Sequence, residues 1–590
     1  MYKAAAVVIL LSLLLYYALY SNSKLKDPSQ LLSRYDYIIV GAGSAGSVLA
    51  SRLSEDSKTT VLLLEAGEDG KLFPHRQIPG LVAFLQKTSI DWQYKSVPQK
   101  YSSFGLNNKE AFWPRGKVLG GTSVLNYMVV TRGHKTDYDR WEKELGCKGW
   151  SWADVLPYFK KLEQAQFAAD PDKRGINGPI RINHTPSSKL GRALVEAAQD
   201  VGFNFNPDYN SGEQEGVTHT QLSADKGVRQ STVKAYLEPA MDRSNLHVVT
   251  GAHVTKVLFD NSKRAVGIEF IYTGRKFQVQ TDKEVILSAG TIASPQLLML
   301  SGVGPTKHME ELKIDTVADS PKVGQNMEDH LLVTLKFSTS DCSAVIDQRN
   351  MLTHLSKAAW NYFTKGEGDW SHSTVEKFIF FASGLTGYES DLQLYFLPVP
   401  DPLPFNLVNQ KDDVGAAQNA NLRKDKCQFT LASTLNRAKS RGEIRLNTSD
   451  PLTPPIIDPQ YLKVQQDVDV LVKGLKVIYQ WLKSEKLRKF DIELTEGTLP
   501  GCEKHQIMSD AWLQCLVRAR ATTVYHHTGT CSMGPSGIRS AVVDTSLRVN
   551  GVKGLRVVDA SIFPTTVSGN TNIPVIMVAE KAADLIRHSE

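Results

Sequence analysis

The sequence predicts an α/β protein whose first folding unit is a Rossmann-like dinucleotide-binding domain. A short apolar run at residues 36–40 leads into a glycine turn, a helical segment and a second apolar run at residues 59–65, which is the order of a βαβ unit. Further apolar runs with strand character lie at residues 245–250, 284–290 and 555–558. The length of 590 residues allows two to four folding units, so this domain fills only part of the chain.

The composition excludes several classes of protein. Apolar residues make up 42% of the chain and charged residues 22%, values typical of globular proteins and not of disordered chains, collagens or coiled coils. The net charge of +6 is small for this length and no dense run of lysine and arginine occurs, so we expect no nucleic-acid partner. Six cysteines without a CxxC pair predict neither a disulfide-built scaffold nor a structural zinc site, and we expect no metal.

Residues 1–23 contain an uncharged apolar stretch at residues 4–20, flanked by Lys3, Lys24 and Lys26. At about 1.5 Å per residue this stretch spans roughly 25 Å as a helix, slightly less than a ~30 Å hydrocarbon core. Two interpretations stay open, a cleaved signal peptide and an uncleaved membrane anchor. Both send the rest of the chain into the secretory pathway, so we expect an extracellular or membrane-anchored protein with its globular part on the extracellular or lumenal side.

The secretory interpretation gives meaning to two sequons and to the cysteines. Asn183 and Asn447 each begin an Asn-X-Ser/Thr sequence, which predicts a glycoprotein. The same compartment permits disulfides. Cys502 and Cys515 lie close together in the sequence, and we expect them to pair; two unrelated thiols are the alternative.

The turn after the first predicted strand has the spacing of a dinucleotide-binding fingerprint, Gly41-Ala42-Gly43-Ser44-Ala45-Gly46. Gly41 makes the tight turn, Gly43 lets the backbone approach a pyrophosphate, and Gly46 lets helix and strand pack closely. The amides at the start of the helix, around Ser44 and Ala45, then face the phosphates with the positive end of the helix dipole.

The second predicted strand ends in Glu65, which is followed by Ala66 and stands near the spacing expected for a ribose contact. A carboxylate there accepts hydrogen bonds from ribose hydroxyl groups and repels a 2′-phosphate, so NADP is disfavoured. The fingerprint itself does not separate FAD from NAD. No second complete copy of it occurs, so one bound dinucleotide is the simplest account.

Four long motifs follow one another along the chain. They are GKVLGGTSVLN at residues 116–126, GTIASPQLLMLSGVG at residues 290–304, VYHHTGTCSMG at residues 524–534, and VVDAS through FP to NTNIP between residues 557 and 574. Shorter segments at residues 440–442 and 458–462 accompany them. In this order the motifs resemble the glucose–methanol–choline (GMC) oxidoreductase family over residues 34–587, and the resemblance implies FAD as the cofactor.

The resemblance also implies which residues surround FAD. The segment with Asn126 would lie against the flavin, with Asn126 near its reactive edge. Leu125 stands where some relatives carry a histidine that binds the flavin covalently, so non-covalent FAD is expected. Val254 would contact the adenine side. The other residues expected around FAD are Gly116, Val118, Thr122, Asp559, Ala560 and Asn572.

His526 is the predicted catalytic base. A histidine can take the hydroxyl proton of an alcohol near neutral pH, and the resemblance places His526 at the catalytic position, with hydride passing from the carbinol carbon to flavin N5. His527 is the alternative, because neighbours in an extended segment point opposite ways and only one can face the flavin. Asn570 matches the second catalytic position, where many relatives carry histidine. Its amide can donate a hydrogen bond to the substrate oxygen but cannot serve as a base.

The resemblance implies a discontinuous architecture of the glucose oxidase type. Residues 34–330 would form the FAD-binding region with inserted segments of the other domain, residues 331–524 mainly an α+β substrate domain on an antiparallel sheet, and residues 525–590 the return to the FAD domain. Residues 398–421 predict a long loop, either over the site entrance or on plain surface. Candidates for the substrate pocket are Trp360, Trp370, Phe378 and Tyr395, with core packing as the alternative for each.

The expected function is oxidation of a CH–OH group of a sugar, aromatic or steroid alcohol, as implied by similarity to animal glucose dehydrogenase-like members of the family. Electrons would pass to O₂ or a quinone-type acceptor. Two alternatives stay open, a hydroxynitrile lyase-like enzyme on the same scaffold and a non-catalytic flavin-binding protein. A serine hydrolase is disfavoured because no GxSxG motif occurs.

Overall fold

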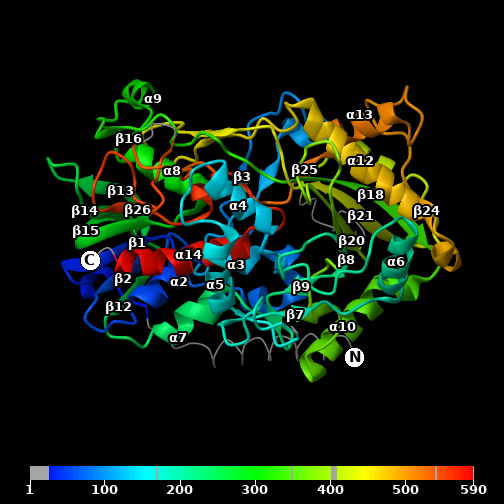
Figure 1. The fold of residues 1–590 in the computed structure, drawn as a ribbon, viewed down its shortest axis with the longest axis horizontal. Coiled ribbons are helices and arrows are strands. Elements are labelled where there is room, and N and C mark those ends of the chain that lie inside the picture. Colours follow the sequence, from blue (N-terminus) through cyan, green and yellow to red (C-terminus); the bar gives the residue numbers. More distant parts are fainter. Residues whose placement is uncertain (1–24, 168–169, 347–349, 400–407, 538–540, 589–590) are drawn as a thin grey trace.

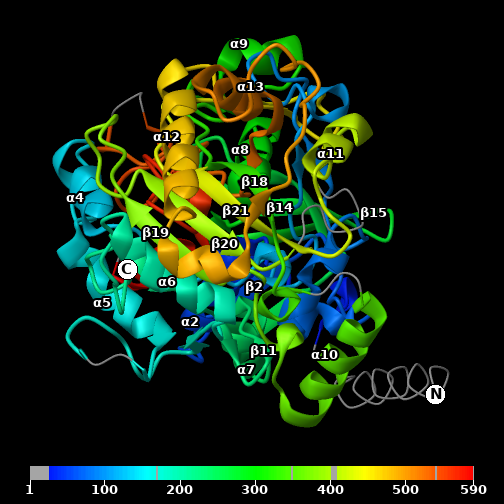
Figure 2. The same ribbon diagram turned by 90° about the vertical axis from the view of Figure 1, so that its right-hand side faces the viewer.

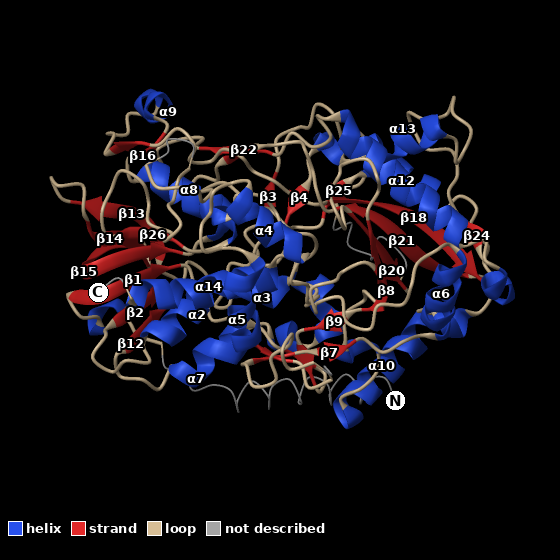
Figure 3. Cartoon of the chain, viewed as in Figure 1, coloured by secondary structure: helices blue, strands red, loops and turns tan. Residues whose placement is uncertain are grey.

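The computed structural model describes residues 25–167, 170–346, 350–399, 408–537 and 541–588. The predicted signal peptide or anchor lies outside these residues, and within them no helix is both long and apolar enough to cross a membrane. Two seven-stranded sheets organise the chain and lie at opposite ends of the molecule (Figure 1). Figure 3 shows these two groups of strands, with helices, loops and short two-stranded pairs between and around them.

The first sheet contains both strands of the predicted βαβ unit. Its order is β12 (Leu246–Val249), β2 (Val61–Leu64), β1 (Arg34–Val40), β15 (Arg275–Leu287), β14 (Ala265–Tyr272) and β13 (His253–Phe259), with β26 (Leu555–Val557) beside β15. The strands β12, β2, β1, β15 and β26 run parallel to one another. The strand β14 is antiparallel to β15, and β13 is antiparallel to β14. The parallel strands end at one edge, which is where ligands bind in sheets of this kind.

The last helix of the chain packs against the first helix of the βαβ unit. The helix α2 (Ser44–Leu53) follows β1, and α14 (Asn572–Arg587) lies beside it (Figure 1). The buried Glu580 of α14 accepts hydrogen bonds from Arg52 Nε at 2.9 Å and from the Tyr236 hydroxyl at 2.8 Å. This ionic and hydrogen-bonded contact fixes the C-terminal segment on the dinucleotide-binding unit.

The second sheet is antiparallel. Its order is β24 (Glu493–Leu494), β18 (Leu331–Thr339), β21 (Cys427–Leu435), β20 (Leu392–Leu397), β19 (Lys377–Phe381) and β8 (Gly216–His219), with β25 (Thr522–Thr523) beside β18. The helix α12 (Gln465–Trp481) lies across one face (Figure 2), where Ser433 Oγ donates to the Leu471 carbonyl at 3.1 Å. Since side chains alternate along a strand, the neighbours Thr430, Ala432 and Thr434 lie on the other face from Ser433.

Two disulfides stabilise this second half. The predicted pair Cys502–Cys515 is confirmed, and a second disulfide, Cys342–Cys427, joins the segment after β18 to the start of β21 across a sequence separation of 85. The cysteines Cys147 and Cys531 are buried and free.

Some surface predictions were wrong. Residues 398–421 are not a continuous loop, because α11 (Asp412–Gln418) lies within them; its first turn carries Asp412 and Asp413, which favour a helix N-terminus although their polarity suggested a loop. Trp360 on α10 (Met351–Lys365) is 68% exposed and belongs to neither pocket nor core. The sequon residues Asn183 and Asn447 are exposed, and glycosylation stays a prediction.

Candidate active site

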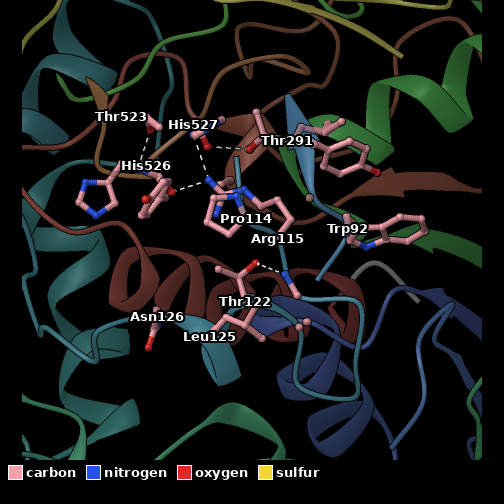
Figure 4. A pocket seen from close by; sticks show the side chains of 18 of the residues that line it. Trp92, Pro114, Arg115, Thr122, Leu125, Asn126, Thr291, Thr523, His526 and His527 are labelled. Carbon is pink, nitrogen blue, oxygen red and sulfur yellow. Dashed lines mark hydrogen bonds between the residues drawn. The ribbon is translucent and has the colours of Figure 1, made fainter. Parts of the chain in front are cut away.

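A cavity of about 640 Å³ lies between the two sheets, a volume typical of ligand sites. Its lining includes most of the residues predicted to bind a cofactor or substrate: Gly41, Gly43, Ser44, Ala45, Glu65, Ala66, Gly116, Thr122, Asn126, Val254, His526, Asp559, Ala560, Asn570 and Asn572. Figure 4 shows Thr122 and Asn126 on one side of the cavity and Arg115 and His526 on the other. Of the four predicted pocket aromatics only Tyr395 lines it.

We call the first side the cofactor wall; it consists of the cavity-lining residues among 41–45, 65–66, 116–126 and 559–560, and of the starts of α8 (Gly290–Leu300) and α14. Two glycine segments meet here backbone to backbone. Gly41 has φ +97°, and a Cβ on Gly121, which has φ +53°, would lie 2.6 Å from the Cα of Gly43. The two segments can lie this close only because neither carries a side chain here, and the close backbone approach to a bound dinucleotide has the same requirement.

Two predicted cofactor residues do not line the cavity. A Cβ on Gly46 would lie 1.9 Å from the Gly41 carbonyl oxygen, so Gly46 serves the packing of α2 on its own turn, as predicted for that glycine. Val118 is fully buried behind the wall. Leu125 lines the cavity and offers no atom for a covalent flavin bond, so the expectation of non-covalent FAD still stands.

Three helices direct their N-termini at the cavity. The first residues of α2, α8 and α14 line it, and the N-cap residue of none of the three makes a side-chain cap. Ser44 Oγ donates to Asn572 Oδ1 at 2.7 Å, which ties the starts of α2 and α14 together. Helix N-termini carry partial positive charge and free amides, so the donors here fit the pyrophosphate of FAD.

The two acids of the cofactor wall also order its backbone. Glu65 accepts hydrogen bonds from the amides of Ala42 and Gly67, both at 2.9 Å, and burial raises its pKa to about 7. Asp559 accepts from the Gly290 amide at 2.8 Å and from Ser294 Oγ at 2.6 Å, and burial raises its pKa too. Glu65 lines the cavity at the end of β2, where the predicted ribose contact would be.

The opposite side, which we call the histidine wall, consists of Asp329, His330, His526, His527 and Asn570. His526 lies between two partners: its Nδ1 is 3.0 Å from Nδ1 of His330, and its Nε2 is 3.1 Å from the amide nitrogen of Asn570. The two predicted catalytic residues therefore contact each other directly. Thr131 Oγ1 donates to Asn570 Oδ1 at 3.1 Å and so orients the amide nitrogen toward His526.

Both contacting histidines are neutral at pH 7. Burial lowers the pKa of His526 well below its usual value, and the nearby His330 and Arg115 lower it further. Burial also lowers the pKa of His330 to about 3. Because Nε2 of His526 accepts from Asn570, its single proton is on Nδ1 and is donated to His330. The arrangement holds Nε2 as a proton acceptor.

A second set of contacts fixes the backbone around His526. Asp329 Oδ1 accepts from the amides of His526 at 3.0 Å and His330 at 2.9 Å, while Asp329 Oδ2 accepts from the Tyr461 hydroxyl. Burial raises the pKa of Asp329 to about 6. Tyr525, just before His526, has φ +67°, a strained conformation for a non-glycine residue of the kind that clusters at functional sites.

His527 points elsewhere. Its Nδ1 lies 3.0 Å from an Nη of Arg115, which also donates to the Tyr525 carbonyl, and its ring packs edge-on against Trp113. The His527 carbonyl accepts from Thr291 Oγ1 at 2.7 Å (Figure 4). His527 is therefore held by Arg115 and Trp113, whereas His526 contacts the second predicted catalytic residue, Asn570.

The sequence analysis missed four residues of this site: Arg115, Asp329, His330 and Tyr461. A signal was present for two of them, since the ionisable run Glu328-Asp329-His330 directly precedes the apolar strand β18. Nothing local marked Tyr461 or Arg115. Within the described residues no cluster of His, Cys, Asp or Glu could hold a metal ion.

Comparisons with known proteins agree with this geometry. Family models for GMC oxidoreductases match residues 35–332 and 438–579. The chain is 37% identical to mitochondrial choline dehydrogenase of Mus musculus (94% of this chain, 89% of that protein) and 37% identical to alcohol dehydrogenase [acceptor] of Pseudomonas putida (94% and 95%). It is 36% identical to glucose dehydrogenase [FAD, quinone] of Drosophila melanogaster (94% and 87%).

Solved structures show the same fold. Pyridoxine 4-oxidase from Mesorbium loti superposes with a TM-score of 0.79 at 28% identity (94% of this chain, 99% of that chain), and formate oxidase with a TM-score of 0.82 at 27% identity (94% and 98%). The chain therefore belongs to the GMC oxidoreductase family and is an FAD-dependent oxidoreductase of the class that acts on CH–OH groups of alcohol-type substrates.

Proposed function

We propose that this enzyme oxidises an apolar alcohol, with His526 as the proton acceptor and Asn570 as the group that orients the hydroxyl. The observation that carries the proposal is the 3.1 Å contact between His526 Nε2 and the Asn570 amide on the cavity wall, with His526 neutral. FAD, held by the cofactor wall, supplies the hydride acceptor when bound.

The proton has one well-defined destination. A substrate hydroxyl entering between His526 and Asn570 would replace their mutual hydrogen bond: the hydroxyl proton goes to Nε2, and the Asn570 amide donates to the alcohol oxygen. The His526 Nδ1–H bond to His330, at 3.0 Å, keeps the ring in the tautomer that accepts at Nε2. Charge that develops on the alcohol oxygen is thereby neutralised by positioned groups.

The substrate side of the cavity favours an apolar alcohol. Its floor is one face of the second sheet, and most of its other walls are aliphatic or aromatic. The apolar lining residues there are Leu106, Met128, Val129, Leu332, Val375, Tyr395, Leu397, Val399, Val408, Ala432 and Val524; the polar ones are Thr334, Thr374, Gln410, Gln418, Thr430, Arg520, Thr522 and Thr523. Among the described residues that line the cavity, the carboxylates are Glu65 and Asp559, and both belong to the cofactor wall.

This chemistry argues against two of the substrate classes named for relatives. A quaternary ammonium alcohol would find no carboxylate on the substrate side, where Arg520 also lines the cavity and is paired with Glu496 at 2.8 Å. A sugar would place several hydroxyl groups against the apolar side chains of this wall, at a cost for each hydroxyl group that the lining glutamines and threonines do not pair. An aliphatic, aromatic or steroid alcohol has one polar group, which the His526–Asn570 pair would receive.

We further propose a secretory location, and we keep both O₂ and a quinone-type compound as candidate electron acceptors. Relatives named for a quinone or an unspecified acceptor are 36–37% identical to the chain, and two relatives named oxygen-dependent choline dehydrogenase are 37–38% identical, so sequence identity does not separate the two acceptors. Two disulfides and two exposed sequons are consistent with an oxidising compartment, reached through residues 1–23 as a signal peptide or anchor.

The test is an anaerobic flavin spectrum of the purified holoenzyme, with alcohols added one at a time. The panel contains a long-chain aliphatic alcohol, benzyl alcohol, a sterol, glucose, choline and a cyanohydrin. We expect bleaching by an apolar alcohol and not by glucose or choline. Bleaching by choline alone would overturn the substrate class. Consumption of the cyanohydrin without bleaching would favour the lyase alternative. Fast return of colour in air would identify O₂ as the acceptor, whereas slow return in air and fast return with a soluble quinone would identify a quinone-type acceptor.

A further inference from the structure

Arg229, at the end of β11 (Val228–Arg229), is buried without a counter-charge. It is 2% exposed. Its guanidinium donates to the carbonyls of Arg76 at 3.0 Å and Ser123 at 3.2 Å, and to both the carbonyl and the side-chain oxygen of Asn126 at 2.6 and 2.9 Å. Its second terminal nitrogen is buried and has no hydrogen-bond partner among the described residues. Every oxygen that Arg229 contacts is neutral.

The other fully buried arginines differ in this respect. Arg132 and Arg174 both pair with Glu163, the latter at 2.8 Å, and Arg556 pairs with Glu284 at 2.6 Å. Burying an unpaired charge is strongly unfavourable even after the protein relaxes. Burial lowers the pKa of Arg229 to about 9, so the group still carries its charge at pH 7. The protein thus keeps at this position a buried cation that is unfavourable for folding, and the described residues supply no anion to pair with it.

The position of Arg229 connects this cation to the cofactor. Asn126 lines the cavity on the cofactor wall, and Arg229 lies directly behind it. Asn126 Oδ1 accepts from both Arg229 and the Met128 amide at 3.1 Å, so its orientation is fixed by two donors. Its amide nitrogen has no acceptor among the described residues and stays available to a ligand.

We propose that Arg229 is an electrostatic and positioning residue for FAD: it stabilises the negative charge of the reduced flavin and fixes Asn126 against the ring. This rests on the proposed function, in which the carbinol carbon loses a hydride with its electron pair to the flavin and the hydroxyl proton goes to His526. The flavin ring, neutral when oxidised, therefore gains one negative charge. A buried cation without a carboxylate favours that charged state over the neutral one.

The experiment compares Arg229→Met and Arg229→Lys holoenzymes with the wild type. The two-electron equilibrium is measured by photoreduction against a reference dye, which needs no alcohol, and the affinity for sulfite is measured as a second anion-dependent readout. In Arg229→Met we expect the equilibrium constant for reduction to fall at least tenfold, about 30 mV for a two-electron couple, with a similar loss of sulfite affinity. Arg229→Lys should retain most of both, and Arg556→Met, a control on a paired arginine, should change neither.

Equal equilibrium constants, within threefold, for wild type and Arg229→Met would overturn the proposal. If Arg229→Met does not fold, the proposal is tested on the wild type. Its photoreduced flavin should have the absorption spectrum of the anionic reduced form at pH 6, and the spectrum of the neutral reduced form would overturn the proposal. If the wild-type enzyme holds FAD but no alcohol bleaches the flavin, the proposed function is contradicted. Photoreduction and sulfite binding can still be measured in that case, so the two failures are distinguishable.

Discussion

The cofactor wall and the histidine wall face each other across one cavity but are built from different materials. The cofactor wall is mostly backbone: glycines without a Cβ, helix N-termini and amides held by Glu65 and Asp559. The histidine wall is made of side chains that are buried and joined by hydrogen bonds, such as His330 and His526, which are 196 residues apart. A backbone wall should be sensitive to an added methyl group, and a side-chain wall to the loss of a functional group.

The largest effect is expected on the histidine wall. His526→Ala should lower the rate constant of flavin reduction by about 10²–10⁴-fold, the usual contribution of a general base, because no other acceptor lies at that position. FAD content should stay unchanged, since the cofactor wall is untouched. Anaerobic stopped-flow reduction with the best alcohol of the panel measures this.

His527→Gln is the matched control for His526→Ala. The introduced glutamine can keep a hydrogen bond to Arg115, and His527 does not contact Asn570. The rate constant of flavin reduction should therefore change far less than in His526→Ala. A larger loss in His527→Gln than in His526→Ala would exchange the roles assigned to the two histidines.

Both disulfides lie in the half of the molecule that is built on the second sheet, so their removal tests that half separately from the cofactor wall. Replacing Cys342 and Cys427 by Ser releases a separation of 85 residues and should cost about 4–5 kcal/mol of unfolding free energy; replacing Cys502 and Cys515, 13 residues apart, should cost about 3 kcal/mol. Thermal unfolding followed by circular dichroism and flavin fluorescence checks both values. Loss of FAD well before loss of secondary structure would contradict the assignment of this effect to the substrate half.

The cofactor wall is tested by adding one methyl group. Gly121→Ala places a Cβ 2.6 Å from the Cα of Gly43 at φ +53°, so we expect weaker FAD binding by about 2–3 kcal/mol, or 30–150-fold in Kd. Gly149→Ala is the control, because Gly149 also has positive φ (+84°) but no heavy atom within 4 Å of an added Cβ, and it does not line the cavity. Fluorimetric FAD titration of the apoproteins gives both values; equal affinities would show that the glycine contact is not needed.

The two walls also differ in how far the sequence predicts them. The constraints on Gly41, Gly43 and Gly46 lie within one βαβ unit, so their spacing alone predicted the turn and its packing. His526 was found through its motif, but its partner His330 belongs to a segment whose place beside His526 depends on the second sheet. The same reasoning separates the disulfides: Cys502–Cys515 is local and was predicted, whereas Cys342–Cys427 requires the pairing of β18 with β21. Arg229 was missed because its unusual feature, a missing carboxylate, exists only in three dimensions.

The smallest predicted effect is the change of the flavin-reduction rate with pH. It tests whether water is excluded from the histidine wall, as the burial of its side chains indicates. Only neutral His526 can accept the hydroxyl proton. A histidine with the ordinary pKa of about 6.5 would be half protonated at pH 6.5, and the reduction rate would be halved there. Because burial, His330 and Arg115 lower the pKa of His526 well below 6.5, its neutral fraction stays nearly complete as the pH falls from 8 to 6.5.

We therefore expect the rate constant of flavin reduction to change less than about twofold over this interval and to fall only at more acidic pH, by up to tenfold per unit once the pH is below the pKa. Stopped-flow reduction at saturating alcohol between pH 8 and pH 5 measures the acid limb. The groups that face His526 are His330, Arg115 and Asp329, and burial raises the pKa of Asp329 to about 6, so Asp329→Asn removes the titration beside His526 that could itself lower the rate. Glu65, whose pKa burial raises to about 7, lies on the cofactor wall of the same cavity, and Glu65→Gln removes that titration. A fall in rate that is centred at or above pH 6.5 and persists in both variants would mean that His526 is hydrated in the working enzyme. Its proton affinity would then be set by water, and not by the buried contacts with His330 and Asn570.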